Sequence, residues 1–397
     1  MCNLESEPLG NARPTIFERI RGSLVKQVVI SGTGLYTPSH SISNDELVAA
    51  FNAYVDDFNE TNKAEIEAGS VQALAQSSSA FIEKASGIKS RFVIDKAGIL
   101  DPKRMTPYIA ERSNDEHSIQ CEMSIVAAKQ ALQQAGKTVD DVDMVIVACS
   151  NLQRAYPAVA VEVQTALGIQ GFAYDMNVAC SSATFGIQSG VNAIQAGSAR
   201  CVLMLNPEIC SSHLNFRDRD SHFIFGDACT AVILEDSEQA VSSVQYKILG
   251  TKLQTVFSNN IRNNAGFLNR CDESGLGKPD KLFIQNGRKV FKEVCPMVAT
   301  QISEHLEELS VPSDQLSRMW LHQANLSMNQ LISKRVLGRT AETHEAPVIL
   351  DSYANTSSAG SIIAFHLHKE DLNSGDYGVI CSFGAGYSIG SVIVKKC

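Results

Sequence analysis

The feature of this sequence that most limits its fold is a pattern that occurs twice. An apolar run that ends in a polar loop spans 142–151, and a second run of the same kind spans 316–325. In the first copy Cys180 follows the end of the run by 29 positions, and in the second copy Asn355 follows it by 30. Small polar residues, a helix-like stretch and another apolar run come after each of them. The repeat predicts a molecule built from two related halves.

Strand-like and helix-like segments alternate along both copies. This alternation predicts a layered α/β fold with mixed sheets, and two copies packed face to face give a five-layer α-β-α-β-α sandwich. We place the first half at 26–240, the second half at 241–397, and an N-terminal extension at 1–25. The predicted helices are 44–58, 121–134, 158–167, 181–196, one within 282–309, 328–337 and 361–372. The predicted strands are 26–31, 142–148, 173–178, 200–205, 225–234, 246–256, 319–321, 379–382 and 390–394.

Composition excludes several classes of protein. The net charge of −9 disfavours nucleic acid as a partner. No apolar run approaches the ~20 residues of a membrane helix, so we expect no membrane insertion. The 11 cysteines lack metal-ligand spacing, which predicts no metal site and reduced thiols in a cytoplasmic protein.

A glycine pair near the first strand needs a separate decision. Gly32 and Gly34 follow the apolar run at 26–31, as the glycines of a dinucleotide-binding loop do. Position 37 is Thr where such a loop has its third Gly, and no short β-α-β unit follows. We therefore do not predict a dinucleotide site.

Cys180 is the strongest candidate nucleophile. A predicted strand leads directly to it, and a predicted helix begins at Ser181. Unpaired N–H groups and the positive end of the helix dipole favour a thiolate at such a position. They can lower a thiol pKa from about 8.5 into the range of about 3.5–7.5. The sequence therefore predicts a thiolate nucleophile at neutral pH.

His322 and Asn355 occupy strand ends in the second copy. His322 follows a strand that contains the only Trp, and Asn355 lies in the polar turn that corresponds to Cys180. Taken singly, each is an ordinary core or turn residue. The repeat, however, brings the tips of matching strands together, so we expect the three side chains to meet at the seam between the halves.

The chain contains five short motifs in this order: 175–183 around Cys180, 225–228, 322–325, 355–358 and 383–387. In this combination the chain resembles the thiolase-like condensing enzymes, specifically the β-ketoacyl-acyl-carrier-protein synthase III group. Elongating synthases carry a second His where this chain has Asn355. Thiolases carry a second Cys in a Cys-x-Gly setting, which Cys381 does not match because Ser382 and Phe383 follow it.

The resemblance implies a decarboxylative condensation in fatty acid biosynthesis. Cys180 takes the acyl group of an acyl-CoA, and the backbone N–H groups of Cys180 and Ala385 form an oxyanion hole. His322 and Asn355 donate hydrogen bonds to the thioester oxygen of malonyl-acyl carrier protein as CO₂ leaves. The product is a 3-oxoacyl-acyl carrier protein, and no cofactor is needed beyond these substrates.

The resemblance also implies three binding surfaces. Arg219 and Phe81 lie on the CoA path, where Phe81 replaces a Trp and Ala85 replaces an Arg of the family. A basic patch for the acidic carrier protein comprises Lys292, Lys334 and Arg335, while Ser327 replaces another basic residue. Tyr156 falls where the family inserts an aromatic side chain into the acyl pocket of a second subunit, which implies a homodimer.

The chain is longer than the compact members of the family, mainly at the N-terminus and in 51–80 and 95–117. We expect these segments to reshape the acyl entrance for a medium-chain primer of about eight carbons. Two other reactions on the same fold stay open. One is a head-to-head or hydroxymethylglutaryl-type condensation with Glu83 or Glu162 as an added base, and the other is acyl transfer without decarboxylation. A non-catalytic scaffold is the third alternative.

Overall fold

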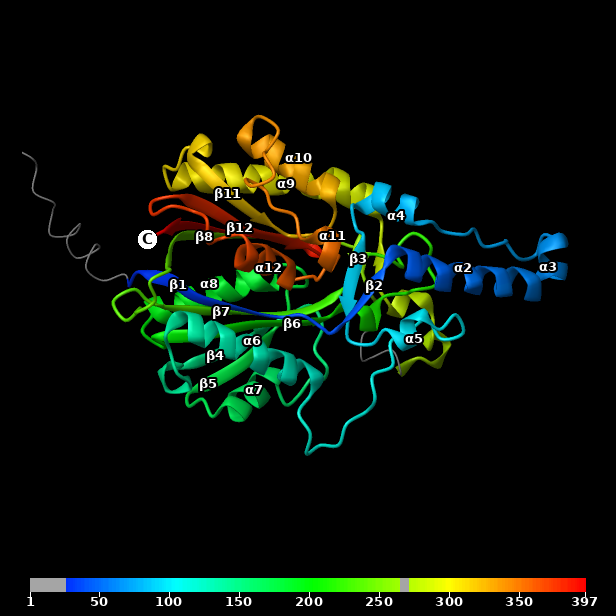
Figure 1. The fold of residues 1–397 in the computed structure, drawn as a ribbon, viewed down its shortest axis with the longest axis horizontal. Helices are drawn as coiled ribbons and strands as arrows, with labels where there is room; N and C mark the ends of the chain where they lie inside the picture. Colours follow the sequence, from blue (N-terminus) through cyan, green and yellow to red (C-terminus); the bar gives the residue numbers. More distant parts are fainter. Residues whose placement is uncertain (1–25, 265–270) are drawn as a thin grey trace, which may run out of the picture.

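The computed structural model describes residues 26–264 and 271–397 (Figure 1). The predicted N-terminal extension at 1–25 lies outside the described residues. Within the described part, nine strands are hydrogen-bonded in one continuous order. The strands of the first half and those of the second half form two neighbouring sets in this order, which are called the first and the second sheet below. The first half contributes, in spatial order, β1 (Val28–Tyr36), β7 (Asp227–Asp236), β6 (Cys201–Ile209), β4 (Met144–Ala148) and β5 (Phe172–Met176). The second half contributes β8 (Tyr246–Ser258), β13 (Gly386–Lys396), β12 (Tyr377–Gly384) and β11 (Leu316–Leu321).

The two sets of strands repeat one pairing pattern. In the first half β4 runs parallel to β6, and β6, β7 and β1 are then antiparallel in turn. In the second half β11 runs parallel to β12, and β12, β13 and β8 are antiparallel in the same way. The sets meet where Val29 and Ile30 of β1 pair with β8. The internal repeat in the sequence is therefore a repeat of structure.

Among the described residues of the second half, no strand takes the place of β5. There, a single backbone hydrogen bond of 2.7 Å joins the Met319 N–H of β11 to the Glu345 carbonyl. Beyond it the chain 338–349 crosses this edge without forming a strand. The edge of the first sheet is thus β5, whereas the edge of the second sheet is covered by a loop.

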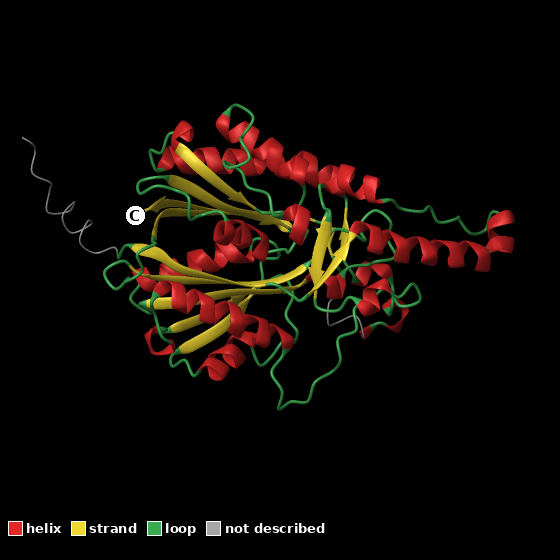
Figure 2. Cartoon of the chain, viewed as in Figure 1, coloured by secondary structure: helices red, strands yellow, loops and turns green. Residues whose placement is uncertain are grey.

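Helices complete a five-layer sandwich, as the repeat predicts (Figures 1 and 2). The outer layers are α6 (Ile119–Ala135) with α7 (Val159–Leu167), and α9 (Gly287–Glu308) with α10 (Leu326–Leu337). The central layer is α8 (Ser182–Gln195) with α12 (Ala359–Leu367), and both of these helices contact strands of both sheets. The main core lies here and joins apolar residues of α8, α12 and the two sheets.

The glycine pair of β1 serves packing. A Cβ at Gly32 would lie 2.1 Å from the Ala131 carbonyl oxygen of α6, and one at Gly34 would lie 1.9 Å from that of Ala127. Only glycine permits such an approach between strand and helix. Both glycines lie inside β1 and not in a loop.

The predicted helix 361–372 is too long, because α12 ends at Leu367. The carbonyl of His368, the next residue, accepts hydrogen bonds from Arg318 and from the Trp320 indole at 2.6 and 3.0 Å. These two side chains of β11 bind the His368 carbonyl, which would otherwise accept the backbone hydrogen bond of a further helical turn. Tertiary contacts therefore override a sequence that would continue the helix.

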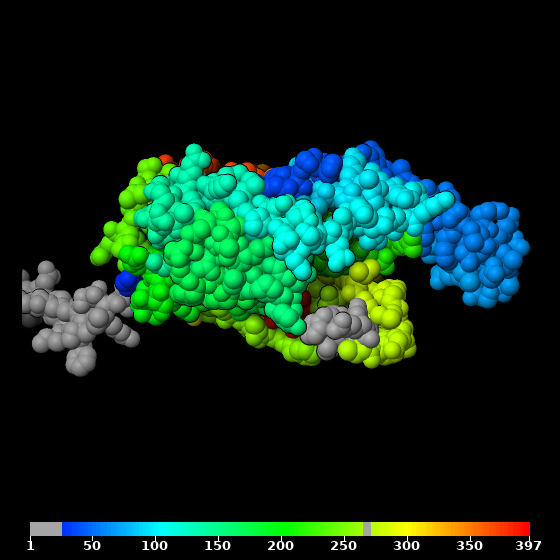
Figure 3. Space-filling view, turned by 90° about the horizontal axis from the view of Figure 1, so that it is seen from below, coloured from blue at the N-terminus to red at the C-terminus, as the bar shows by residue number. Residues whose placement is uncertain are grey.

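The predicted excursion after residue 50 is a helical arm (Figures 1 and 3). The helix α2 (Asn44–Thr61) begins at a capping box, in which Ser43 and Glu46 exchange hydrogen bonds. Near the body of the molecule, Phe51 of the arm stacks on His222 with ring centroids 4.5 Å apart. The remaining elements around the arm and the site are β2 (His40–Ser43), α3 (Lys63–Glu67), α4 (Ser79–Ser86), β3 (Ser90–Val93), α5 (Ala97–Leu100), β9 (Ile261–Arg262), β10 (Ile284–Gln285) and α11 (Leu350–Tyr353).

Candidate active site

Cys180 lies in a tight turn between β5 and α8. The preceding residue, Ala179, has a φ of 47°, a left-handed conformation that is costly for a residue with a Cβ. The Ser182 hydroxyl stabilises this turn, because it accepts from the Val178 N–H at 2.8 Å and donates to the Ala179 carbonyl at 2.7 Å. The turn therefore aims Cys180 away from its own sheet and toward the second half of the chain.

Groups from the second half surround the thiol. The Ser357 hydroxyl donates a hydrogen bond to the Cys180 Sγ at 3.4 Å. A Cβ at Gly384, the last residue of β12, would lie 3.1 Å from the same sulfur. Glycine at this position therefore lets the end of β12 reach the thiol. The next residue, Ala385, has a backbone amide that interacts with the thiol, as does the amide of Cys180 itself.

Burial raises the pKa of the Cys180 thiol to about 11. Ser357 and the backbone amides of Cys180 and Ala385 act in the opposite direction, but burial outweighs them. The expectation of a lowered thiol pKa, based on the helix terminus alone, is therefore wrong for the substrate-free chain. The sequence shows the helix start but not the apolar walls that remove water from the sulfur.

His322 lies at the carboxyl end of β11, buried against the Phe383 ring. The two ring centroids are 5.2 Å apart with an interplanar angle of 87°. The His322 N–H donates to the Cys381 carbonyl at 2.8 Å, which extends the pairing of β11 with β12 up to the site. Burial lowers the pKa of the His322 imidazole to about 4. The ring is therefore neutral at pH 7, with one nitrogen that carries a hydrogen.

Asn355 is held by both halves of the chain. Its N–H donates to the Ile224 carbonyl at 2.9 Å, and its own carbonyl accepts from the Gly226 N–H at 3.1 Å. Its side-chain oxygen accepts from the Ser357 N–H at 2.8 Å. Because that oxygen is engaged, the amide NH₂ is the part of the side chain that remains to bind a substrate oxygen.

A buried carboxylate, Glu208, ties the two halves together beside the thiol. At the end of β6 it accepts hydrogen bonds from the N–H and hydroxyl of Ser150, at 2.9 and 2.6 Å. It also accepts from the N–H and the hydroxyl of Ser358, which lies in the turn that follows Asn355. Burial raises the pKa of Glu208. In the sequence, Glu208 is noticeable as an acidic residue near the end of the apolar run 201–209. The run does not show which residues bind this carboxylate.

The three predicted residues line one cavity of about 690 Å³. Cys180 comes from the first half, and His322 and Asn355 come from the second, so the repeat brings them together as expected. The cavity walls are largely aromatic and aliphatic, and they include Phe223, Phe225, Phe283, Phe291, Val290, Val294, Met328 and Phe383. This arrangement places a nucleophile and two uncharged hydrogen-bond donors in an apolar site.

The residues expected on the CoA path lie close to each other. Phe81 and Ala85 of α4 line the same cavity as Cys180. The Arg219 guanidinium lies over the Phe81 ring at 4.2 Å, and its Nε donates to the Gln76 carbonyl at 2.8 Å. Arg219 therefore covers one face of the ring, and the loop that returns from the arm to α4 holds it there.

The three residues of the expected carrier-protein patch are all exposed on two neighbouring helices. Lys292 lies on α9, and Lys334 and Arg335 lie on α10. Arg288, in the first turn of α9, lines the Cys180 cavity as well. The sequence did not predict Arg288 as a site residue. It belongs to no motif, and a basic residue near a helix start is common on protein surfaces.

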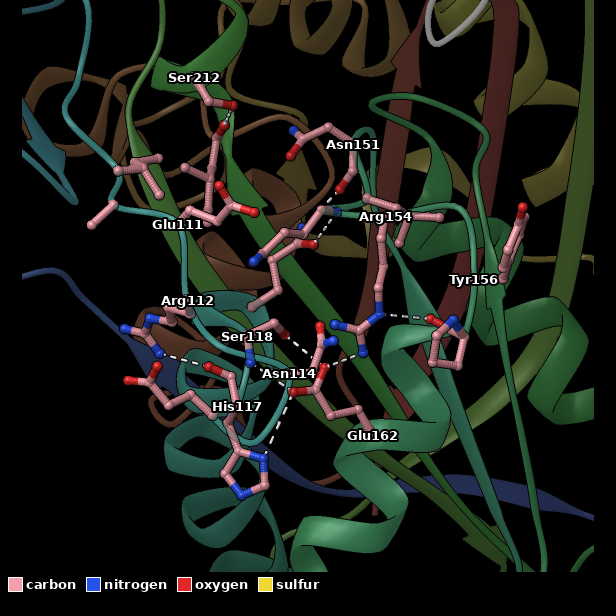
Figure 4. A pocket seen from close by; sticks show the side chains of 18 of the residues that line it. Glu111, Arg112, Asn114, His117, Ser118, Asn151, Arg154, Tyr156, Glu162 and Ser212 are labelled. Atoms are coloured by element: carbon pink, nitrogen blue, oxygen red, sulfur yellow. Dashed lines mark hydrogen bonds and ion pairs between the residues drawn. The ribbon is translucent and has the colours of Figure 1, made fainter.

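Tyr156 does not reach Cys180 within one chain. Its side chain is 85% exposed, and it lines a second cavity of about 1160 Å³ (Figure 4). Glu162 lies in this cavity too, paired with Arg154 at 2.5 Å and bonded to the Ser118 hydroxyl at 2.8 Å. Neither Glu162 nor Glu83 of α4 is among the residues that line the Cys180 cavity. Within one chain, therefore, neither of the two proposed glutamate bases lies in the Cys180 cavity.

The surroundings of Glu162 do not suit a metal ion. His117 and Cys121 have ligand atoms close to its carboxylate. The carboxylate, however, already neutralises Arg154, and burial raises the pKa of the Cys121 thiol to about 12. A cation would have to displace the arginine and find a thiol that holds its proton. Among the described residues this is the single group with metal-ligand geometry.

The duplicated sandwich and the cavity shared by its halves define a condensing enzyme of the thiolase-like class. Comparisons with known proteins narrow this class. Residues 174–255 match the family model of 3-oxoacyl-[acyl-carrier-protein] synthase III, and residues 306–396 match the model of its C-terminal part. The chain is 68% identical over 347 residues to the β-ketodecanoyl-[acyl-carrier-protein] synthase of Pseudomonas aeruginosa, which covers 87% of this chain and 99% of that protein.

More distant relatives agree with this assignment. The β-ketoacyl-[acyl-carrier-protein] synthase III of Clostridium perfringens is 27% identical over 371 residues, covering 92% of this chain and 98% of that protein. The solved structure of a 3-oxoacyl-(acyl carrier protein) synthase III from Pseudomonas aeruginosa has a TM-score of 0.72 at 22% identity, with 93% of this chain and 98% of that chain covered. The chain belongs to the β-ketoacyl-acyl-carrier-protein synthase III family, and so it is an acyltransferase that carries out a condensation of fatty acid synthesis.

Among the described residues, no helix combines the length and the apolar character that a membrane span requires.

Proposed function

We propose that the chain condenses a medium-chain acyl-CoA of about eight carbons with malonyl-acyl carrier protein, through an acyl group held on Cys180. The observation that carries this proposal is the shared cavity, in which the nucleophile of one half faces the two neutral donors of the other. The products are a 3-oxoacyl-acyl carrier protein, CO₂ and free CoA.

In the first step Cys180 Sγ attacks the thioester carbon of the acyl-CoA. The new C–S bond forms first and gives a tetrahedral intermediate, whose collapse breaks the C–S bond to CoA, and the thiol proton leaves with the CoA sulfur. The oxygen of the tetrahedral intermediate carries the negative charge. The amides of Cys180 and Ala385, which both act on the thiol, are the donors proposed for this oxygen. The loss of one such donor typically lowers a rate by about 10²–10³-fold.

In the second step the malonyl thioester oxygen accepts hydrogen bonds from His322 and Asn355. The C–C bond to the carboxylate breaks, CO₂ leaves, and the electron pair forms an enolate that attacks the acyl carbon. Donors that carry no charge suit this step, because an imidazole with a pKa near 4 stays a neutral donor at physiological pH. The collapse of the second tetrahedral intermediate returns the electron pair to Cys180 Sγ, and a proton from solvent restores the thiol.

The chain length rests on the relative at 68% identity. The name of that protein, β-ketodecanoyl-[acyl-carrier-protein] synthase, gives a ten-carbon 3-oxo product, which is two carbons longer than an eight-carbon primer. The phenylalanines of the cavity, Phe225 and Phe283 among them, provide apolar walls for such a chain. Each buried CH₂ contributes about 0.8 kcal/mol, so the preference for one length is expected to be steep.

The substrates and a second subunit have candidate surfaces. Phe81 and Arg219 are proposed for the CoA nucleotide, and the basic patch of Lys292, Lys334 and Arg335 is proposed for the acidic carrier protein. For a homodimer we propose pairing along β5, the sheet edge on which Phe172 and Tyr174 are 43% and 37% exposed, with Tyr156 directed to the partner. All ten described cysteines are free thiols, which supports the proposed cytoplasmic location.

The test is a series of saturated acyl-CoAs from two to twelve carbons, each supplied with radiolabelled malonyl-acyl carrier protein. We expect the highest kcat/KM at eight carbons, with release of labelled CO₂ and a 3-oxoacyl product identified by mass spectrometry. The Cys180→Ala variant is the control that removes acyl transfer. An optimum at acetyl-CoA would overturn the chain length, and a product formed without CO₂ release would overturn the reaction.

A further inference from the structure

The contact between Ser357 and Cys180 has no role in the mechanism described so far. The Ser357 hydroxyl is a donor to the sulfur at 3.4 Å, and the two residues are 177 positions apart in the chain. Both Ser357 and its neighbour Thr356 are buried. A buried hydroxyl aimed at a nucleophilic sulfur from the other half of the fold is not a by-product of local chain geometry.

The backbone holds Ser357 in this position against a conformational cost. Its φ is 49°, in the left-handed region that residues with a Cβ rarely adopt. The hydrogen bond from its N–H to the Asn355 side chain, at 2.8 Å, keeps it there. Uncommon backbone conformations of this kind concentrate at functional sites. The same turn therefore orients the Asn355 amide and presents the Ser357 hydroxyl to the thiol.

The other ionisable groups near the sulfur do not supply a donor to it. Glu208 lies on the side of β6, and its charge disfavours a thiolate. Cys210 follows Glu208 and is buried with its thiol protonated, because burial raises its pKa. The His322 ring lines the same cavity, but its hydrogen-bond partner is the backbone of Ser357 and not the sulfur. Ser357 is therefore the one side chain, among the described residues, that donates a hydrogen bond to the Cys180 sulfur.

We propose that the Ser357 hydroxyl is a further catalytic group, which stabilises negative charge on the Cys180 sulfur. This inference rests on the proposed role of Cys180 as the nucleophile. The charge is present twice in each turnover: before Sγ attacks the acyl-CoA, and again when the C–S bond of the second tetrahedral intermediate breaks. In both cases the hydroxyl keeps its proton and donates a hydrogen bond, so no additional base or acid is consumed. Hydrogen bonds to charged groups are the stronger ones, and a buried site strengthens them further.

The test measures the rate of alkylation of Cys180 by iodoacetamide between pH 7 and 9, with mass spectrometry to identify the labelled residue. We expect Ser357→Ala to be alkylated about three- to tenfold more slowly than the natural chain at each pH, since fewer thiolates form while each remaining thiolate is more reactive. The kcat of condensation is expected to fall, with the KM for malonyl-acyl carrier protein unchanged.

Two further variants separate the hydroxyl from its surroundings. Ser357→Gly also lacks the hydroxyl but accepts the positive φ, so it is expected to fold well and to be alkylated as slowly as Ser357→Ala. Thr356→Val is the matched control, because the buried Thr356 hydroxyl has no hydrogen-bond partner among the described residues. It is expected to be alkylated at the rate of the natural chain.

The possible outcomes are distinct. Alkylation of Ser357→Ala or Ser357→Gly at the natural rate overturns the role of the hydroxyl, as does an equal loss in Thr356→Val. If the natural chain is not labelled at Cys180, the proposed nucleophile itself is wrong, and the test of Ser357 then refutes the proposed function and not merely this inference.

Discussion

At the scale of single residues, the proposed mechanism assigns acyl transfer and carbanion formation to different groups of the site. Cys180 and its neighbouring amides come from the seam between the halves, where the acyl group is proposed to be held. His322 and Asn355 both belong to the second half, and the proposed mechanism has both of them donate to a different oxygen, that of the malonyl thioester. Because the imidazole is neutral and the amide cannot titrate, neither residue is expected to be needed for the transfer of the acyl group to Cys180.

Replacement of His322 or Asn355 by Ala is expected to abolish condensation and to spare acyl loading. Loss of donors to a developing enolate typically costs a factor of about 10²–10³ per donor. The measurement is radiolabel transferred from acyl-CoA to the protein, compared with 3-oxoacyl product in the same samples. If label and product fall together in either variant, the separation of the two steps is wrong.

Cys180 and His322 could be predicted from the sequence because each follows a strand of a repeated unit. Asn355 could be predicted because its polar turn corresponds to that of Cys180, although the expected strand before it is wrong, since the short helix α11 stands there. The environment of these three residues could not be predicted. Ser357 and Gly384 contact the thiol from far along the chain, and the pKa near 11 arises from apolar walls contributed by several segments. Burial of this kind is a property of the folded molecule, and no local pattern encodes it. The partners of Glu208 were hidden for the same reason.

At the scale of elements, the turn that carries Ala385 is fastened to a distant helix. The hydroxyl of Tyr387, two residues into the following strand, donates to Glu293 of α9 at 2.8 Å. The same hydroxyl accepts from the side chain of Asn260, just after β8, at 2.7 Å. This group of three links the proposed oxyanion turn to the helix that lines the cavity. An amide positioned in this way needs little reorganisation when charge develops.

Tyr387→Phe is therefore expected to lower kcat for acyl transfer several-fold while the Tm changes by only a few degrees. The ring still fills its buried site, and only the hydroxyl contacts are lost. Tyr377→Phe is a suitable control, because that hydroxyl lies on β12 next to Lys395 and far from the thiol in the chain. Equal losses in kcat for the two variants would show that the Tyr387 hydroxyl does not position the turn.

At the scale of the whole molecule, buried histidines make stability depend on pH. Burial lowers the pKa to about 4 for five of them: His213, His222, His305, His322 and His366. Between pH 4 and about 6.5 the unfolded chain binds protons that the folded chain refuses, so stability rises with pH across this window. Asp227 acts in the opposite direction below pH 6, because burial raises its pKa to about 6. Because five histidines oppose this one aspartate, the free energy of unfolding is expected to rise with pH overall across this window.

The urea midpoint is accordingly expected to be lower at pH 5 than at pH 7. A matched pair of unfolding curves at constant ionic strength measures this difference, and the activity of refolded samples confirms that the transition is reversible. A midpoint that is equal or higher at pH 5 would mean that the histidines are accessible to protons in the folded state.

The unequal edges of the two sheets bear on how copies of this chain associate. In the described part of the molecule, β5 leaves one edge open, while the loop at Glu345 closes the other. A strand that pairs with its own copy across a two-fold axis uses up both open edges at once. In the proposed homodimer, association along the sheet thus stops at two chains, because the covered edge offers a third copy no open strand to pair with.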